Sequence, residues 1–252
     1  MYTGGVKVEC VNINHQRNHP SYFSYGDLEV AKLLSKHVLL TREQIKACGF
    51  ATRRLGHMVK FGLLYRYRVL DYQDNLIVSA YAVGPAAKFF LSYPIVGMNN
   101  PYKVQSMLAI NQVLIYIMSR APEARIDINL HRPVQAIVTI NNPLGICAPR
   151  KSFDRTFLSR HNISQAIVVL PDRNLVSSGL PVRYCFDDEL DDPFNLKFYL
   201  CRSGVTLEQV ALFPGDEKEE TDKQSGQERA QTKKTVSSSS KEVQGQLFAT
   251  IS

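Results

Sequence analysis

Residues 41–83 of the chain read TREQIKACGFATRRLGHMVKFGLLYRYRVLDYQDNLIVSAYAV. Thr41 is followed three residues later by Gln44, a pairing in which the two side chains satisfy backbone N–H groups at the start of a helix. A helix is therefore predicted to begin near Arg42. It is predicted to end at Gly49, because glycine readily takes the positive φ that closes a helix.

A second helix is predicted over residues 51–61, and Gly62 stops it. Its apolar side chains recur at 3.6-residue spacing, which predicts a stripe that packs against a core. This stripe consists of Ala51, Leu55, Met58 and Val59. The opposite face is cationic and consists of Arg53, His57 and Lys60, with Thr52 and Arg54 at its edges.

Two strand-like runs follow, over residues 63–70 and 76–83, and a polar interval separates them. Such an interval between runs of β-branched and aromatic residues predicts a β-hairpin. Upstream, apolar residues at helical spacing predict a helix over residues 27–38, and a proline predicts a further short helix over residues 85–91. Three helices followed by a hairpin is the order of a winged helix-turn-helix.

Positive charge is concentrated in this region. Between Lys36 and Arg68 there are eight Lys or Arg residues and one acid, Glu43, so the segment alone carries +7, which equals the net charge of the whole chain. A focused positive surface attracts phosphate and gains affinity through counterion release, which indicates double-stranded DNA as the partner. The predicted DNA-binding residues are Arg42, Thr52, Arg53, Arg54, His57 and Lys60, with Arg66 and Arg68 on the hairpin contacting phosphates.

Composition restricts the remaining possibilities. The chain has 252 residues and 44% hydrophobic content, which suits one or two domains with real cores. Five cysteines without a C-x-x-C pair indicate neither a disulfide framework nor a zinc ribbon, and they suit a reducing cytoplasm. No membrane segment is expected. A metal site at Cys10, His15 and His19 is not expected either, because the sequence offers no fourth ligand near them. We therefore expect residues 1–20 to form a flexible polar arm and the protein to use no metal or cofactor.

A second ordered region is predicted after a linker at residues 94–101, which contains Gly, Asn and two prolines. Residues 102–120 form a strongly apolar helix, and residues 102–213 as a whole predict a mixed α/β domain. Its predicted strands are 126–130, 134–140, 166–170, 182–186 and 196–200, with a helix around 153–161. Residues 214–252 are predicted to be a disordered tail, because they contain almost no aliphatic side chains up to residue 246.

Three motifs carry a family resemblance. They are L-T-R-E-Q-I at residues 40–45, R-R-L-x-x-M-V-x-x-G-L-L at 53–64 and A-I-N-Q-V-L at 109–114. The chain resembles the replication-relaxation proteins of bacterial plasmids and integrative elements, best over residues 27–120. The resemblance implies a DNA-associated role in replication or maintenance of a mobile element. It also implies that the second domain is related to the restriction-endonuclease-like fold.

The sequence departs from the active members of that nuclease fold. Such enzymes need clustered carboxylates that hold Mg²⁺, but Gln135 and Cys147 stand where two of these acids are expected. The acidic run at residues 187–192 is predicted to be a solvated loop. The chain also lacks the phosphate-binding loop, the G-x-S-x-G turn and the H-E-x-x-H helix. No catalytic residue is therefore assigned.

The expected fold is α+β: an N-terminal winged helix-turn-helix over residues 21–93, followed by a small mixed α/β domain that resembles a degenerate nuclease. The expected function is non-enzymatic DNA binding in replication or transcription control of a plasmid or mobile element. One alternative is a metal-dependent nuclease that uses displaced carboxylates of Asp127, Asp172 and the acidic run. Another is an interaction scaffold for replication or conjugation proteins. Many helix-turn-helix proteins dimerise, so a homodimer is a further expectation.

Overall fold

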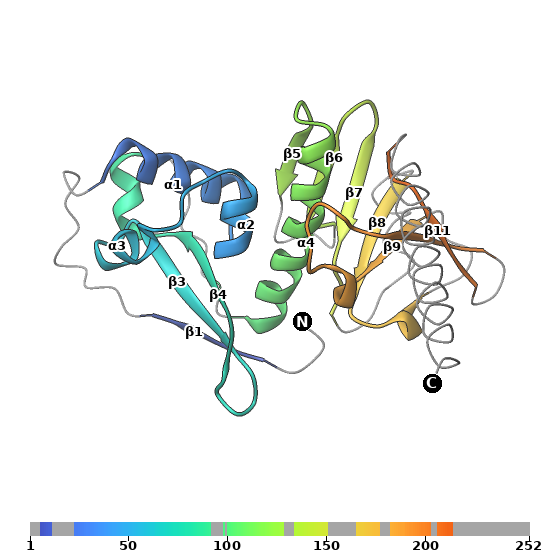
Figure 1. The fold of residues 1–252 in the computed structure, drawn as a ribbon, viewed down its shortest axis with the longest axis horizontal. Helices are drawn as coiled ribbons and strands as arrows, with labels where there is room; N and C mark the ends of the chain where they lie inside the picture. The colour runs from blue at the N-terminus through green and yellow to red at the C-terminus, as the bar shows by residue number, and fades with distance from the viewer. Residues whose placement is uncertain are drawn as a thin grey trace, which may run out of the picture. The chain divides into compact units, whose positions relative to one another are not determined.

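The fold is given by a computed structural model that describes residues 6–11, 23–91, 98, 100–128, 134–150, 165–176, 182–202 and 206–213. Residues Met1–Val210 belong to one compact unit. In the described part of this unit, helices and two separate sheets are combined in one chain, so the protein is of mixed α and β architecture, as predicted (Figure 1). No helix in these ranges is long and apolar enough to cross a membrane.

The N-terminal part contains a four-stranded antiparallel sheet and three α-helices. Its elements are β1 (Lys7–Cys10), α1 (Tyr25–His37), β2 (Leu40–Thr41), α2 (Arg42–Ala47), α3 (Leu55–Lys60), β3 (Leu64–Leu70), β4 (Leu76–Val83) and the 3₁₀ helix η3 (Pro85–Phe89). The strand order is β1-β3-β4-β2, and β3 and β4 form a hairpin. The predicted helices and hairpin are thus present within a few residues of their expected bounds.

Local signals explain why these elements begin and end where they do. The predicted capping box at α2 is formed: the Thr41 hydroxyl accepts from the Gln44 N–H and the Gln44 side chain accepts from the Thr41 N–H. A second capping box at Ser24 and Asp27 opens α1. Gly49, with φ +85°, closes the turn after α2.

Helix α3 is shorter than predicted. It begins at Leu55, and Ala51 is exposed rather than part of a buried stripe. The physical reason lies in the preceding turn, where Phe50 packs against the core that α1, α2 and α3 share. The chain has to bring this ring inward before it can turn into a helix, so residues 51–54 stay outside α3.

The predicted flexible arm also needs correction, because part of it is a strand. Strand β1 pairs antiparallel with β3 over all four of its residues, and the Val11 N–H extends the pairing by donating to Arg66 O at 2.8 Å. The edge of β3 offers unpaired backbone groups, and β1 satisfies them. His15 and His19 lie outside the described residues.

The second sheet has seven described strands in the order β11-β10-β9-β8-β7-β6-β5. Its elements are α4 (Pro101–Arg120), β5 (Arg125–Ile128), β6 (Ala136–Thr139), β7 (Pro143–Cys147), β8 (Gln165–Leu170), η4 (Arg173–Leu175), β9 (Val182–Phe186), η5 (Asp187–Glu189), β10 (Phe198–Cys201) and β11 (Leu207–Val210). Strands β7, β8 and β9 run parallel to one another, and the other neighbours are antiparallel. The predicted strands are confirmed, whereas β7 and β11 were not predicted. The helix expected around 153–161 and the tail at 214–252 lie outside the described residues.

Helix α4 packs against both the N-terminal core and the second sheet. All of its residues from Val104 to Ile117 are buried, which is the pattern of a helix covered on every side. Ile115 belongs to the N-terminal core cluster, while Tyr116 packs its ring against Phe198 of the second sheet. The expected linker before α4 ends earlier than predicted, because Pro101 is already helical and Met98 is fully buried. Apart from these two residues and Asn100, the linker lies outside the described residues.

Candidate nucleic-acid interface

Helix α2 is fixed to α4 by the Gln44 side chain, which is buried. Its amide nitrogen donates to the carbonyl oxygen of Leu108 and to Oε1 of Gln112, both at 2.9 Å. Its amide oxygen is used at the same time in the α2 capping box. Because every polar atom of this buried amide has a partner, α2 is held in one position. The turn that leads to α3 therefore starts from a rigid base.

Helix α3 presents one face to the core and the opposite face to solvent. Leu55, Met58 and Val59 are buried, so helical geometry directs the other side of α3 outward. That outer side carries Gly56 and Lys60 from α3, together with Arg53 from the preceding turn, and all three are exposed. Among the described residues, neither Arg53 nor Lys60 has an ion-pair partner; the Lys60 ammonium lies 5.6 Å from the Phe61 ring centre.

Arg54, although predicted to contact DNA, is engaged inside the protein. Its Nε and Nη2 atoms donate to the Asp27 carboxylate at 2.9 and 2.7 Å, respectively, a two-point contact with a carboxylate that is 3% exposed. Burial alone would raise the pKa of Asp27. Hydrogen bonds from Arg54 and Ser24 outweigh that effect, so the pKa lies below its ordinary value. Arg54 therefore anchors the start of α3 to α1.

This contact predicts a pH-dependent stability difference. Arg54→Ala leaves the buried Asp27 carboxylate without its cation and should lower the free energy of unfolding at neutral pH. The wild-type contribution is present above the unfolded pKa of Asp and is lost as pH falls through the lowered folded pKa. In urea titrations, the free energies of unfolding of the variant and the wild type should therefore become more similar below pH ~4. Arg53→Ala is the matched control, and an equal loss in both variants would contradict this role.

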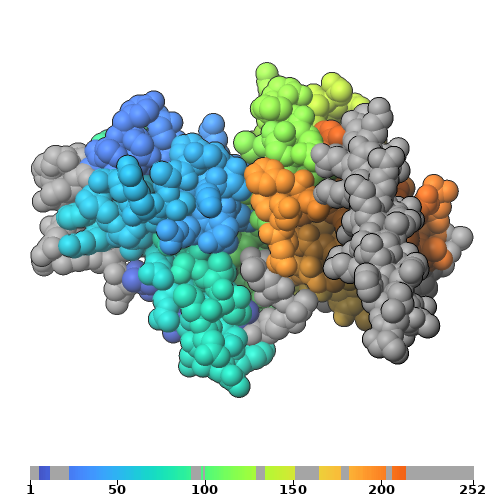
Figure 2. All heavy atoms as spheres, in the orientation of Figure 1, coloured from blue at the N-terminus to red at the C-terminus, as the bar shows by residue number. Residues whose placement is uncertain are grey.

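The other predicted residues of the α2–α3 region lie close to one another. Arg42 is exposed, and its Nε donates to the Thr52 hydroxyl at 3.2 Å, which joins the start of α2 to the turn before α3. The His57 ring lies 4.6 Å from the Phe61 ring, and its Nδ1 is 3.4 Å from Nη2 of Arg54. In Figure 2, residues 40–60, coloured blue to cyan, form a continuous part of the visible face. The structure thus brings together the predicted residues of α2 and α3.

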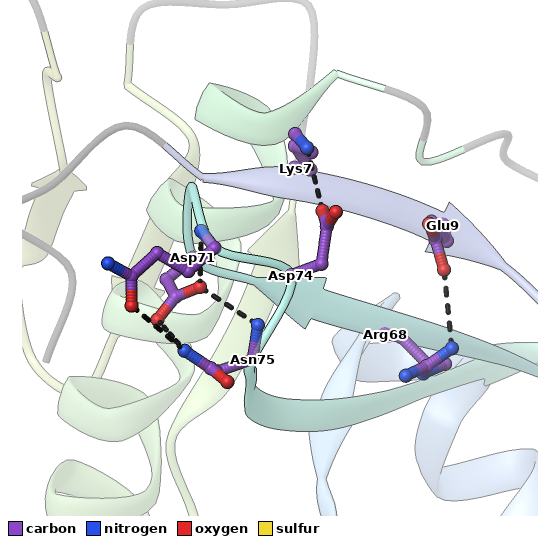
Figure 3. A network of polar contacts seen from close by, with 7 residues as sticks. Lys7, Glu9, Arg68, Asp71, Asp74 and Asn75 are labelled. Carbon is purple, nitrogen blue, oxygen red and sulfur yellow. Dashed lines mark hydrogen bonds and ion pairs between the residues drawn. The ribbon is translucent and has the colours of Figure 1, made fainter.

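The hairpin arginines are arranged differently from the prediction. Arg66 lies in the middle of β3 and donates to the Ser79 hydroxyl at 3.0 and 3.2 Å, and Arg68 pairs with Glu9 at 3.4 Å. The hairpin tip carries two acids, Asp71 and Asp74 (Figure 3). Carboxylates at the tip repel phosphate, so the expected phosphate contact through this hairpin has little electrostatic support.

The tip acids have structural roles. Asp71 accepts from the Asn75 side-chain amide at 3.0 Å and from the backbone N–H groups of Asn75 and Gln73, which shapes the turn. These hydrogen bonds, that of the Asn75 side chain foremost, lower the pKa of Asp71. Asp74, at φ +63°, accepts from Lys7 of β1 at 2.6 Å. The hairpin is therefore tied to β1 through Lys7 and, further along β3, through the Arg68 and Glu9 pair (Figure 3).

Gln135 and Cys147, which stand where an active nuclease would have metal-binding acids, make structural contacts in and beside the second sheet. Gln135 accepts from the Ala148 N–H at 2.8 Å, and burial raises the pKa of the Cys147 thiol to about 12. The acidic run is not simply solvated, as was predicted: Asp187 is fully buried and pairs with Arg150. Arg173 pairs with the next two acids, Asp188 and Glu189. In the parts of the chain that the structure describes, no group of three or more His, Cys, Asp or Glu side chains is placed to hold a metal ion.

A cleft of about 880 Å³ opens between α2, β4, α4 and residues 190–194. It is lined by three cations, Arg42, Lys46 and Arg66, and by three acids, Glu43, Asp191 and Asp192. Opposite charges in equal number give no net attraction for a polyanion. The cleft is therefore not included in the candidate interface.

Comparisons of the chain with protein family models, with curated proteins and with solved structures find no match. The candidate interface is consequently defined by geometry and charge. Its exposed cations are Arg42, Arg53 and Lys60, and Thr52 and His57 are half-buried beside them. Sequence reasoning missed two contributors: Asp27, which holds Arg54 in place, and Gly56, which lies on the exposed side of α3.

Proposed function

We propose that the protein binds double-stranded DNA through a winged helix formed by α1, α2, α3 and the β3–β4 hairpin. The observation that carries this proposal is the outer side of α3, where Arg53 and Lys60 project into solvent without a carboxylate partner among the described residues. The order of helices and strands supports the winged-helix assignment, with β2 pairing to β4 beside the hairpin. An exposed helix of this kind fits the major groove, which is roughly 12 Å wide.

Three features support α3 as the contacting element. Its buried stripe fixes its rotation, the Arg54 and Asp27 contact fixes its start, and Gln44 fixes the preceding helix to α4. Rigid presentation matters because side chains that are already ordered lose less entropy on binding. The acidic hairpin tip favours a docking mode in which α3 carries the main contact and the hairpin tip stays away from the phosphates.

We further propose that the second domain is a degenerate relative of the restriction-endonuclease-like fold without nuclease activity. Its support is the order of elements: α4, then three antiparallel strands, β5 to β7, and then β8 parallel to β7. Three acids of the run that a nuclease could use, Asp187, Asp188 and Glu189, are engaged by Arg150 and Arg173. The proposed biological role is replication or transcription control of a plasmid or mobile element, together with proteins of a replication or conjugation machine.

Charge removal on α3 tests the proposed DNA binding. The double variant Arg53→Ala with Lys60→Ala should weaken binding by about tenfold or more, and each lost phosphate contact should reduce the slope of log K against log salt by about 0.9. The measurement is fluorescence anisotropy with a labelled duplex of mixed sequence about two helical turns long, at increasing KCl concentrations. Lys197→Ala removes an exposed charge from the second domain and is the matched control.

Two results would contradict the proposed function. One is the absence of duplex binding by the wild-type protein at low salt. The other is a double variant whose affinity and salt slope equal those of the wild type and of Lys197→Ala, because the phosphate contacts would then lie elsewhere.

A further inference from the structure

Gly56 is the second residue of α3 and is exposed on its outer side. A methyl group at this position would meet no other atom of the described protein within 4 Å, and its backbone does not adopt the left-handed conformation that favours glycine. Folding therefore gives no reason for glycine here. Glycine inside a helix is in fact less favourable than alanine, because its backbone loses more freedom on folding.

The surroundings of Gly56 suggest what its missing side chain allows. Lys60 follows it by four residues within α3, which is the spacing of neighbours on one helix face, and the exposed Arg53 lies in the turn that leads into α3. His57 is half-buried and contacts Phe61 and Arg54. On the exposed side of α3, Gly56 is therefore one position without a side chain, with the exposed cations Arg53 and Lys60 on either side of it in the chain. Long flexible cations beside such a position can reach phosphates while the backbone itself touches the nucleic acid.

We infer that Gly56 is the point of closest approach between α3 and duplex DNA, and that its lack of a side chain lets the backbone of α3 lie against the groove. A side chain at this position would act as a spacer and would move Arg53 and Lys60 away from the phosphates they contact. This inference rests on the proposed DNA binding and adds to it how deeply α3 enters the groove of the duplex.

The test separates stability from affinity, because the two are expected to change in opposite directions. Gly56→Ala should raise the melting temperature by roughly 1–4 °C, since alanine is the better helix former and meets no obstacle. The same variant should weaken binding of the labelled mixed-sequence duplex by about tenfold, comparable to the loss of one phosphate contact. Gly56→Gln, with a larger side chain of good helix propensity, should weaken binding further while leaving the protein folded.

Gly26→Ala is the matched control. Gly26 is also the exposed second residue of a helix, α1, and a methyl group there would meet only the Ser24 hydroxyl oxygen, at 4.0 Å. This variant should bind DNA like the wild type. If Gly56→Ala binds the duplex as tightly as the wild type or more tightly, the inference is overturned and the proposed function still stands. Equal weakening in Gly26→Ala and Gly56→Ala also overturns it, whereas failure of the wild-type protein to bind any duplex overturns the proposed function itself.

Discussion

Arg150→Met is expected to lower the free energy of unfolding by about 3–5 kcal/mol, because it leaves a buried carboxylate without its cation. The Arg150 side chain is 3% exposed and Asp187 is 0% exposed, so neither charge is solvated. Arg150 also donates to the carbonyl oxygen of Gln105 on α4 at 3.2 Å. Loss of this side chain therefore removes a contact between α4 and the segment that follows β7, in addition to the ion pair.

Replacing both members of the pair should give a very different result. Arg150 Nε and Asp187 Oδ1 are buried without a hydrogen-bond partner, so the pair does not fully compensate for its desolvation. The double variant Arg150→Met with Asp187→Leu should accordingly recover most of the stability that the single variant loses. Burial raises the pKa of Asp187 and Arg150 opposes this rise, so the single variant should be least impaired in acid, where the carboxyl can take up a proton.

Urea titrations of the wild type, the single variant and the double variant measure these effects. Arg202→Ala is the control, because its ion pair with Glu208 is 71% and 48% exposed and should contribute at most about 1 kcal/mol. A single variant that remains within about 1 kcal/mol of the wild type would show that the pair is hydrated or is not formed.

Gly84→Ala is expected to destabilise the protein by about 3 kcal/mol or more, since the backbone leaves no room for a side chain. A methyl group at this position would overlap the carbonyl oxygen of Gly62 and would lie 2.9 Å from backbone carbons of Leu63 and Leu64. Backbone atoms cannot turn away as the end of a long side chain can. The Gly84 N–H also donates to the Leu63 oxygen at 2.8 Å, which holds the two segments together.

The melting temperature of Gly84→Ala, compared with that of Gly26→Ala, measures this effect. Both variants add the same methyl group, but the one at Gly26 meets only open space beyond a distant hydroxyl oxygen. An unchanged melting temperature in Gly84→Ala would mean that β3 and the segment after β4 can separate without cost, contrary to the close packing described above.

The elements that could be predicted from the sequence are those specified by neighbouring residues. Thr41 with Gln44, Gly49 and Gly62 each act within a few positions of the chain, and the helix bounds follow from them. The hairpin was equally predictable, because residues 71–75 separate two runs of strand-forming residues. Strand β7 was missed because it contains Pro143 and Gly145, residues that usually mark turns.

The candidate interface was predictable as a region but not atom by atom. Whether a cation is free depends on partners that are distant in sequence: Arg54 is held by Asp27 and Arg68 by Glu9. The role of β1, which brings Glu9 to the sheet, follows from an unsatisfied sheet edge rather than from any pattern within its four residues. Charge counting therefore located the cationic surface and overestimated the number of side chains available to bind DNA.

The position of α4 has a consequence for any attempt to excise the N-terminal module. Asn111, fully buried on α4, donates to the backbone oxygens of His37 and Leu39, and its own oxygen lies 3.0 Å from Nδ1 of His37. A fragment that stops before Pro101 would lose these partners and would also expose apolar side chains of the core to which Ile115 belongs. Such a fragment should be prone to aggregation. A fragment that extends through Arg120 keeps the partners of Asn111, but it loses the Leu190 oxygen to which the buried Gln112 amide donates and the Phe198 ring against which Tyr116 packs. The part of the chain that contains α3 is thus expected to fold stably only together with α4 and the sheet that covers it.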